Sequence, residues 1–338
     1  MRRVLVPLSL SPGQPALGSA VFDAAGSTMG TSWRARVVLA PGAQAANSGA
    51  LVAVLQRQLD TVVAQMSHWE RESDLSRFNR AAAGSWHVLP PAFHSVLTYA
   101  LQVADASGGA YDPCAGALVN CWGFGARQRY DEAGFQAPSD TDIDMIIARQ
   151  DRLRLQVDTA TGKVMQPGAV EIDLSSVAKG YAVDQLARSL EAQGVRHYLV
   201  EVGGELRGAG VKPDGQPWWV TLEDVPDADD QAPVVVALHG LAVATSGDYR
   251  RHFQHGGARA SHTLDPRTGY PIQNNVASVT VLHAECVAAD ALSTALSVLG
   301  ADAGIRFAED RHLAARFLLR GRNGLQEVST AAFKAMLQ

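Results

Sequence analysis

Two stretches of the chain place carboxylate and hydroxyl side chains where a phosphate or a cation could bind. In residues 171–186 (EIDLSSVAKGYAVDQL), Asp173 ends a predicted buried strand, and Ser175 and Ser176 lead into a predicted helix. The N-terminus of a helix attracts phosphate through its free N–H groups and its dipole. Lys179, one turn inside, could add a positive charge. An ordinary capped helix with a solvated lysine accounts for the same residues.

The second stretch, residues 286–300 (CVAADALSTALSVLG), has one carboxylate in the middle of a small and apolar helix. A helix that is apolar all round is expected to be buried. Asp290 would then cost on the order of several kcal/mol unless it is paired or bound to a metal. Thr294 lies one turn further along the same face. The two oxygen ligands suit a hard cation such as Mg²⁺; a hydrogen bond from the backbone to Asp290 is the alternative.

A histidine marks the third candidate. In residues 261–272 (SHTLDPRTGYPI), His262 precedes an Asp-Pro-x-Thr-Gly turn signature. A histidine there could act as an acid, a base or a donor to phosphate. A structural loop histidine is the alternative.

Aromatic side chains gather in two further segments. Residues 111–125 (YDPCAGALVNCWGFG) could wall a flat ring ligand or form a tight turn in the core. In residues 66–80 (MSHWERESDLSRFNR), Trp69 ends a predicted helix, and the residues 76–79 follow in a predicted polar loop. Together with Thr-Met-Gly-Thr at 28–31, these segments predict a pocket lined by aromatic rings and sulfur.

The sequence lacks the common motifs of nucleotide-binding proteins, metalloproteases and esterases. It has no G-x-x-x-x-G-K-[ST], no clean G-x-G-x-x-G, no H-E-x-x-H and no G-x-S-x-G. With 29 Lys and Arg against 34 Asp and Glu the net charge is −5, and no basic cluster appears, which argues against a nucleic-acid partner. The longest apolar runs fall short of the roughly 20 residues that a membrane span needs.

The three cysteines and the N-terminus bear on the compartment. Cys114, Cys121 and Cys286 are an odd number without a C-x-x-C, so buried thiols are favoured over a Cys114–Cys121 bridge. Arg2 and Arg3 before a short apolar stretch imitate a signal peptide, but Pro7 interrupts it. We therefore expect a cytoplasmic protein, with export as the minority hypothesis.

Periodic apolar residues predict the elements that must position these groups. The 338 residues, 47% of them apolar, can form a sizeable core. Mixed strands and helices without strict βαβ alternation indicate an α+β fold. Residues 1–24 are predicted to be disordered, and 25–338 to form a single domain, since no linker divides them. Strands are predicted at 31–39, 153–158, 169–174, 196–202, 217–223, 233–239, 241–245, 276–283 and 314–319, and helices at 48–66, 91–106, 176–193, 286–299 (closed by Gly300) and 330–337.

These segments together resemble the ApbE family, the FAD:protein FMN transferases. The similar blocks span about residues 26–300 in one order. They are TMGTSW, SRFN, LVNCWGFG, DLSSVAKGYAVD, EVGGEL, SGDY, SHTLDPRTGYP and ADALSTAL. The resemblance implies an α+β fold of mixed sheets with packed helices, and a flavin site in a cleft between two lobes. It implies an enzyme that uses FAD and Mg²⁺, moves FMN onto a Thr or Ser hydroxyl of an acceptor flavoprotein, and releases AMP. A Mg²⁺-dependent FAD pyrophosphatase and a non-catalytic FAD carrier are the alternatives. Members are usually exported or tethered to the membrane, so a periplasmic location is the alternative to the cytoplasm.

The resemblance also assigns roles to residues. It makes His262 the candidate for acid–base chemistry or phosphate stabilisation, and it puts Ser293 near a metal. The metal ligands would be Ser176, through its backbone oxygen, Asp290 and Thr294. The implied FAD contacts are Met29, Trp69, Ala110, Tyr111, Asp112, Asp173, Lys179 and Leu264, with the flavin ring against Trp69 or Tyr111.

Overall fold

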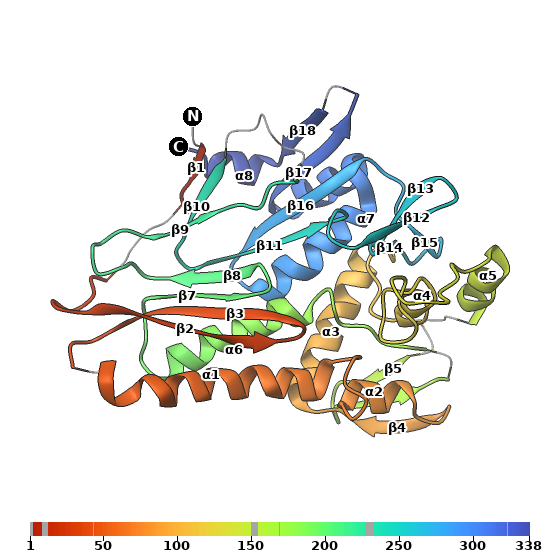
Figure 1. Ribbon diagram of the computed structural model, residues 1–338, viewed down its shortest axis with the longest axis horizontal. Helices are drawn as coiled ribbons and strands as arrows, with labels where there is room; N and C mark the ends of the chain where they lie inside the picture. The colour runs from red at the N-terminus through yellow and green to blue at the C-terminus, as the bar shows by residue number, and fades with distance from the viewer. Residues whose placement is uncertain are drawn as a thin grey trace.

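The centre of the molecule is an eight-stranded antiparallel sheet (Figure 1). The computed structural model describes residues 3–8, 13–42, 44–149, 155–168, 170–226, 233–322 and 324–338. The sheet has the order β18-β17-β16-β11-β8-β7-β3-β2. Its strands are β2 (Ala20–Thr28), β3 (Thr31–Leu39), β7 (Tyr198–Val202), β8 (Glu205–Ala209), β11 (Leu241–Gly247), β16 (Val276–His283), β17 (Ala314–Gly321) and β18 (Gly324–Ser329).

Four helices and this sheet enclose the main core. They are α1 (Gln44–Met66), α3 (Pro91–Ala106), α6 (Ala178–Ala192) and α7 (Cys286–Asp310). Trp33 of β3, Leu55 of α1, Phe93 of α3 and Leu296 of α7 are buried in one apolar cluster. Figure 1 shows α1 and α6 along the β2–β3 end of the sheet, and α7 next to β11 and β16.

Helix α7 is long and apolar enough to cross a membrane by length and composition alone, but most of it is buried inside the protein. It packs against β11, β16 and α6, as a core helix does. Gly300, with φ 78° and ψ 179°, breaks its helical backbone, and a second helical stretch follows to Asp310. The sequence placed the break correctly but missed the continuation.

A smaller sheet packs on a second apolar cluster and includes the first strand that the structure describes. Its order is β1-β10-β9, with β1 (Arg3–Leu5), β10 (Val234–Leu238) and β9 (Trp218–Thr221), next to α8 (Ala331–Ala335). The predicted disorder of residues 1–24 is wrong for β1, which pairs with β10 and buries Leu5 completely, and for the start of β2. The partner strand lies about 230 residues away in sequence, so local composition could not reveal it.

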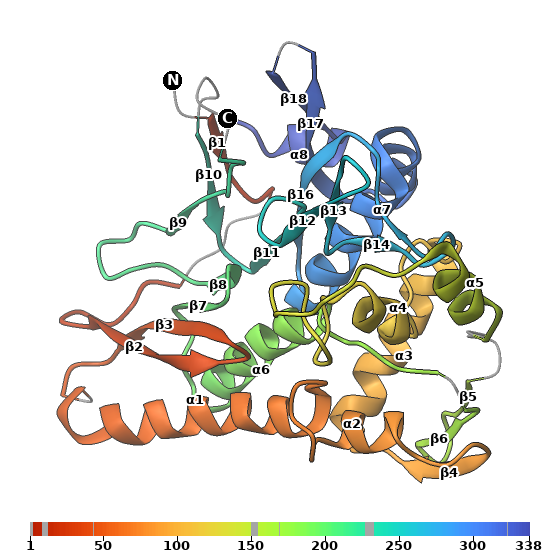
Figure 2. The same cartoon turned by 45° about the vertical axis from the view of Figure 1, so that its right-hand side comes forward.

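The remaining elements are short. An aromatic cluster that includes Trp122 and Phe124 joins several of them. The elements are α2 (Asp74–Asn79), β4 (Ser85–Val88), α4 (Gly116–Cys121), α5 (Asp140–Arg149), β5 (Gln156–Asp158), β6 (Lys163–Gln166), β12 (His252–His255), β13 (Ala258–Ser261), β14 (Leu264–Asp265) and β15 (Tyr270–Pro271). In Figure 2, α2, β4, β5 and β6 lie beyond the end of α1, with α4 and α5 above them.

The α+β class predicted from the sequence is confirmed. β3, α3 and β16 begin and end at the predicted residues. The polar loop at 76–79 is instead part of α2, which Ser73 caps by accepting from the Ser76 N–H. The strand at 169–174 is wrong over 170–174, where Glu171 makes only an isolated bridge to Ala115; residue 169, like 153 and 154, lies outside the described ranges.

Candidate functional site

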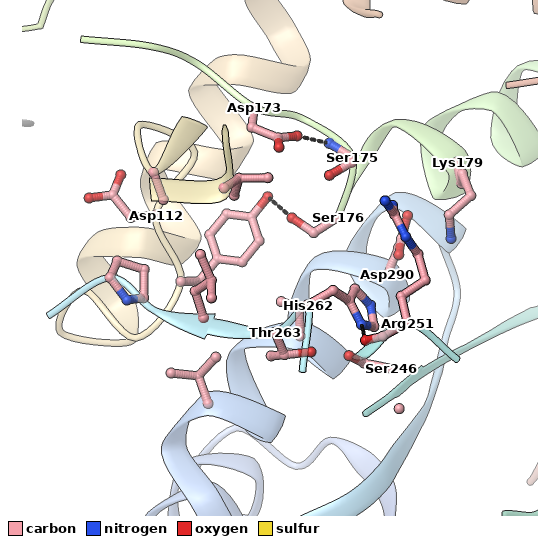
Figure 3. Close-up of a pocket in the computed structure, with 18 of the residues that line it drawn as sticks. Asp112, Asp173, Ser175, Ser176, Lys179, Ser246, Arg251, His262, Thr263 and Asp290 are labelled. Atoms are coloured by element: carbon pink, nitrogen blue, oxygen red, sulfur yellow. Dashed lines mark hydrogen bonds between the residues drawn. The ribbon is translucent and has the colours of Figure 1, made fainter. Parts of the chain in front are cut away.

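A cavity of about 300 Å³ lies where α6, α7 and β11 meet the segment before α4 and the loop before β14 (Figure 3). Sequence positions nearly 190 residues apart therefore form one wall. The predicted site residues in its lining are Ala110, Tyr111, Asp112, Asp173, Ser176, Lys179, His262, Leu264, Asp290 and Thr294.

Two predicted FAD contacts, Met29 and Trp69, are not part of this lining. Met29 occupies the β2–β3 turn with φ 50° and packs against the main core. Trp69 follows α1 in a turn, remains 47% exposed, and its ring lies beside that of His68. The Nδ1 of His68 is 3.5 Å from Oδ1 of Asp173, so Trp69 is near the cavity but outside it.

Backbone donors orient the two aspartates on one side of the cavity. Asp112 Oδ1 accepts from the Cys114 N–H at 2.9 Å, and Asp173 Oδ1 accepts from the Ser175 N–H at 2.7 Å. Between them, the Ser176 hydroxyl donates to the Tyr111 hydroxyl oxygen at 3.2 Å (Figure 3). Burial raises the pKa of Tyr111, which therefore stays neutral. Tyr111 presents a fixed ring to the cavity.

Asp290 enters the cavity from the middle of α7. Its Oδ2 accepts from the Gly180 N–H at 2.9 Å, in the first turn of α6. The backbone-bonded alternative therefore holds for this oxygen, whereas the described residues record no bond to Oδ1. A Cβ on Gly180 would lie 2.3 Å from the Cys286 carbonyl oxygen, so the close approach of α6 and α7 needs glycine. Burial raises the pKa of Asp290, against the opposing charge of Lys179.

Thr294 and Ser293 differ although they are neighbours. Thr294 lines the cavity on the same face as Asp290. The Ser293 hydroxyl is buried and donates to the Asp290 carbonyl oxygen at 2.9 Å, and Ser293 is not in the lining. Of these two hydroxyls, Thr294 is the one placed to bind a ligand.

Lys179 is not the solvated lysine of the alternative interpretation, nor a free positive charge. It forms an ion pair with Glu205, whose side chain is only 3% exposed. Burial opposes the charge of Lys179, but Asp290 and Glu205 outweigh it and raise the pKa of the ammonium. Lys179 is therefore a cation in the cavity wall.

His262 is held by the backbone of Arg251. The backbone N–H of His262 donates to the Arg251 carbonyl oxygen at 3.0 Å. The ring Nδ1 of His262 lies 3.2 Å from the same oxygen. Because a carbonyl can only accept, Nδ1 carries the ring proton and Nε2 is left with a lone pair. Burial lowers the pKa of His262 to about 4, so the ring is neutral at pH 7.

Comparisons with known proteins identify the family of this chain. The family model of the ApbE family matches residues 29–317. The chain belongs to the ApbE family.

Curated and solved relatives in this family align over nearly the whole chain. The FAD:protein FMN transferase of Vibrio cholerae is 36% identical over 92% of this chain and 91% of its own length, and that of Escherichia coli K12 is 35% identical over 92% and 88%. The crystal structure of Pseudomonas stutzeri flavinyl transferase ApbE in its apo form superposes with a TM-score of 0.85, at 36% identity, over 94% of this chain and 97% of that one.

A magnesium site can be built from few carboxylates when hydroxyl and backbone oxygens complete it. Among the described residues, no group of three or more His, Cys, Asp and Glu side chains could hold a metal. The implied set is different, because it combines one carboxylate with a hydroxyl and a backbone oxygen. Asp290, Thr294 and Ser176 line the same cavity, and the open Oδ1 of Asp290 gives a hard-oxygen donor. The residues fit Mg²⁺.

Several residues of the cavity lining were not predicted from the sequence. Glu205 follows the paired glycines of the EVGGEL block, and Arg250 and Arg251 follow the SGDY block. β11 contributes Thr245, Ser246 and Gly247 to the lining. Of these residues, only the adjacent Arg250 and Arg251 carry a signal in the sequence itself, because two neighbouring positive charges could bind an anion.

Proposed function

We propose that this chain is a Mg²⁺-dependent FAD:protein FMN transferase that modifies a Thr or Ser hydroxyl of an acceptor flavoprotein. One observation carries the proposal. The predicted metal ligands, His262 and the ring of Tyr111 line one cavity, in a chain that belongs to the ApbE family. In the reaction, the acceptor hydroxyl attacks the FMN phosphorus of FAD. A phosphoester bond forms, the pyrophosphate bond breaks, and AMP leaves.

The chain's own residues perform distinct tasks in this proposal. His262 takes the proton of the acceptor hydroxyl at Nε2, since its Nδ1 already donates to the Arg251 carbonyl. The neutral ring with a free lone pair supports a base rather than a donor to phosphate. Lys179 and Arg251 provide positive charge at the cavity for the phosphates. Tyr111 forms a wall for the flavin ring.

The metal has a defined place in this scheme. Asp290, Thr294 and the Ser176 backbone oxygen would hold Mg²⁺, which neutralises negative charge on the pyrophosphate when bound. Asp290 is suited to this because a buried carboxylate with one open oxygen has few other ways to remain ionised.

Incubation with FAD, Mg²⁺ and an acceptor protein that carries a family-type Ser/Thr motif tests the function. We expect covalent flavin fluorescence on the acceptor in a denaturing gel, together with AMP, and none in excess chelator. Free FMN and AMP without labelling would instead establish a pyrophosphatase. Unchanged FAD would establish a carrier.

A further inference from the structure

The Lys179–Glu205 ion pair is built into the fold. Glu205 begins β8 directly after a turn in which Gly203 and Gly204 have φ 60° and 103°. A Cβ on Gly203 would lie 2.9 Å from Thr31 Cγ2 and 3.5 Å from Lys179 Cδ, so this turn packs against the lysine chain. Glu205 is thereby fixed beside the ammonium, with only 3% of its side chain exposed.

Lys179 has a second carboxylate close by that it does not pair with. Gly180, the next residue, donates its N–H to Asp290, and both Asp290 and Glu205 act on the charge of Lys179. In the described part of the chain, Lys179 forms an ion pair with Glu205 and none with Asp290. The open oxygen of Asp290 is therefore not taken by an internal cation.

The Glu205 end of the ion pair is buried, whereas the Lys179 side chain is 29% exposed and borders the cavity. Removing the charge of Glu205 would leave the ammonium without its partner in a partly buried site, which is unfavourable. Without the charge of Glu205, the flexible lysine chain would turn to Asp290, the other carboxylate that acts on its charge. An ammonium on Asp290 competes directly with a divalent cation for the same oxygen.

We propose that Glu205 is a positioning residue that holds the Lys179 ammonium away from Asp290 and so keeps Asp290 open for the divalent cation. The inference rests on the proposed metal site. It assigns to the EVGGEL block a task in metal binding, in which Glu205 acts through its ion pair with Lys179.

Direct Mn²⁺ binding to the purified full chain without FAD, followed by electron paramagnetic resonance, tests this in four proteins. They are the wild type, Glu205→Gln, Lys179→Met and the double variant. Glu205→Gln should raise the Mn²⁺ dissociation constant at least about tenfold when Lys179 is present. In the Lys179→Met background the same change should raise it less than about threefold, because no competitor remains.

The double-mutant comparison separates the proposal from simpler effects. Loss of the carboxylate charge as such weakens Mn²⁺ equally in both backgrounds, so equal ratios would overturn the proposal, as would unchanged binding by Glu205→Gln. Glu171→Gln, which breaks the Arg127 ion pair without touching Lys179, is the matched control and should bind Mn²⁺ like the wild type.

If Glu205→Gln does not fold, Glu205→Asp, with a retracted carboxylate, should give an intermediate loss of Mn²⁺ affinity, and wild-type affinity there would overturn the proposal. A wild type that binds no Mn²⁺ would refute the metal site itself.

Discussion

Helices α6 and α7 each contribute one buried aspartate that accepts hydrogen bonds from the start of the other helix. One of the two aspartates is fully paired, and the other borders the cavity. Asp184 of α6 accepts from the N–H groups of Cys286 and Val287 at 3.0 and 2.9 Å, at the start of α7. Asp290 of α7 accepts from the Gly180 N–H at 2.9 Å, at the start of α6. Each carboxylate satisfies N–H groups that a helix start leaves without partners.

The two carboxylates differ in how many of their oxygens are hydrogen-bonded and in whether a cation is paired with them. Both oxygens of Asp184 are used, the residue is completely buried, and Arg207 Nη1 lies 2.6 Å away as its counter-ion. Asp290 has one recorded bond, borders the cavity, and its neighbouring cation is paired with Glu205. A carboxylate with its own counter-ion serves the fold, and one without is available to a ligand.

The largest expected effect separates the two aspartates by activity. Asp290→Asn keeps the shape of the side chain and removes its charge, so the developing charge of the pyrophosphate is no longer neutralised. We expect FMN transfer to fall at least about 10³-fold, with little change in the unfolding midpoint. Gel labelling at several Mg²⁺ concentrations measures this, and full activity at ordinary Mg²⁺ would return Asp290 to a purely capping role.

The converse change is expected to act on stability. Asp184→Ala leaves Arg207 without a buried partner and two N–H groups of α7 unsatisfied, which should cost about 3–5 kcal/mol of unfolding free energy. Urea denaturation of this variant beside Asp290→Asn measures the contrast. The contrast is lost if Asp184→Ala is as stable as Asp290→Asn.

The pH dependence of stability tests His262, a cavity residue whose ring, among the described residues, has no counter-ion in its hydrogen bonds. His262 has a pKa of about 4 in the folded chain against an ordinary value of 6.5. Between these values the unfolded chain binds the additional proton, so stability falls as pH decreases from 6.5 to 4. The difference of about 2.5 pKa units corresponds to at most about 3.5 kcal/mol of unfolding free energy, at roughly 1.4 kcal/mol per unit.

His262→Asn should therefore lose less stability than the wild type over this range. Urea denaturation of both proteins at pH 7 and at pH 4.5 measures the difference. Parallel losses in the two proteins would mean that His262 does not carry this acid sensitivity.

The smallest effect concerns the hydroxyl next to Asp290. Thr294→Ala removes one of the proposed ligands but not the charge, so activity should fall about tenfold and recover in part at raised Mg²⁺. Ser297→Ala is the matched control, because the Ser297 hydroxyl is buried on the same helix and donates to the Ser293 carbonyl at 2.8 Å. Equal activity losses in both variants would assign Thr294 to packing.

Much of the scaffold follows from the sequence because its signals are local. Helix α3 has Pro91 in its first turn and a regular apolar stripe, and β16 is rich in Val and other residues typical of a strand, so both were predicted to the residue. The polar pairs β12–β13 and β14–β15 were missed because alternation in so few residues is too weak. The hidden strand β1 depends on β10, far away in the chain.

The sequence by itself determined the candidates for chemistry: Asp290 in an apolar helix, His262 before a turn, and Asp173 before a helix start. Only the tertiary structure decided which of them share a cavity, that Trp69 lies outside it, and that Lys179 pairs with Glu205. The sequence marked Asp290 but not Asp184, although the structure buries both. The physical reason is that the free energy of a buried charge depends on its neighbours in space, such as Arg207 for Asp184, and no local pattern encodes them.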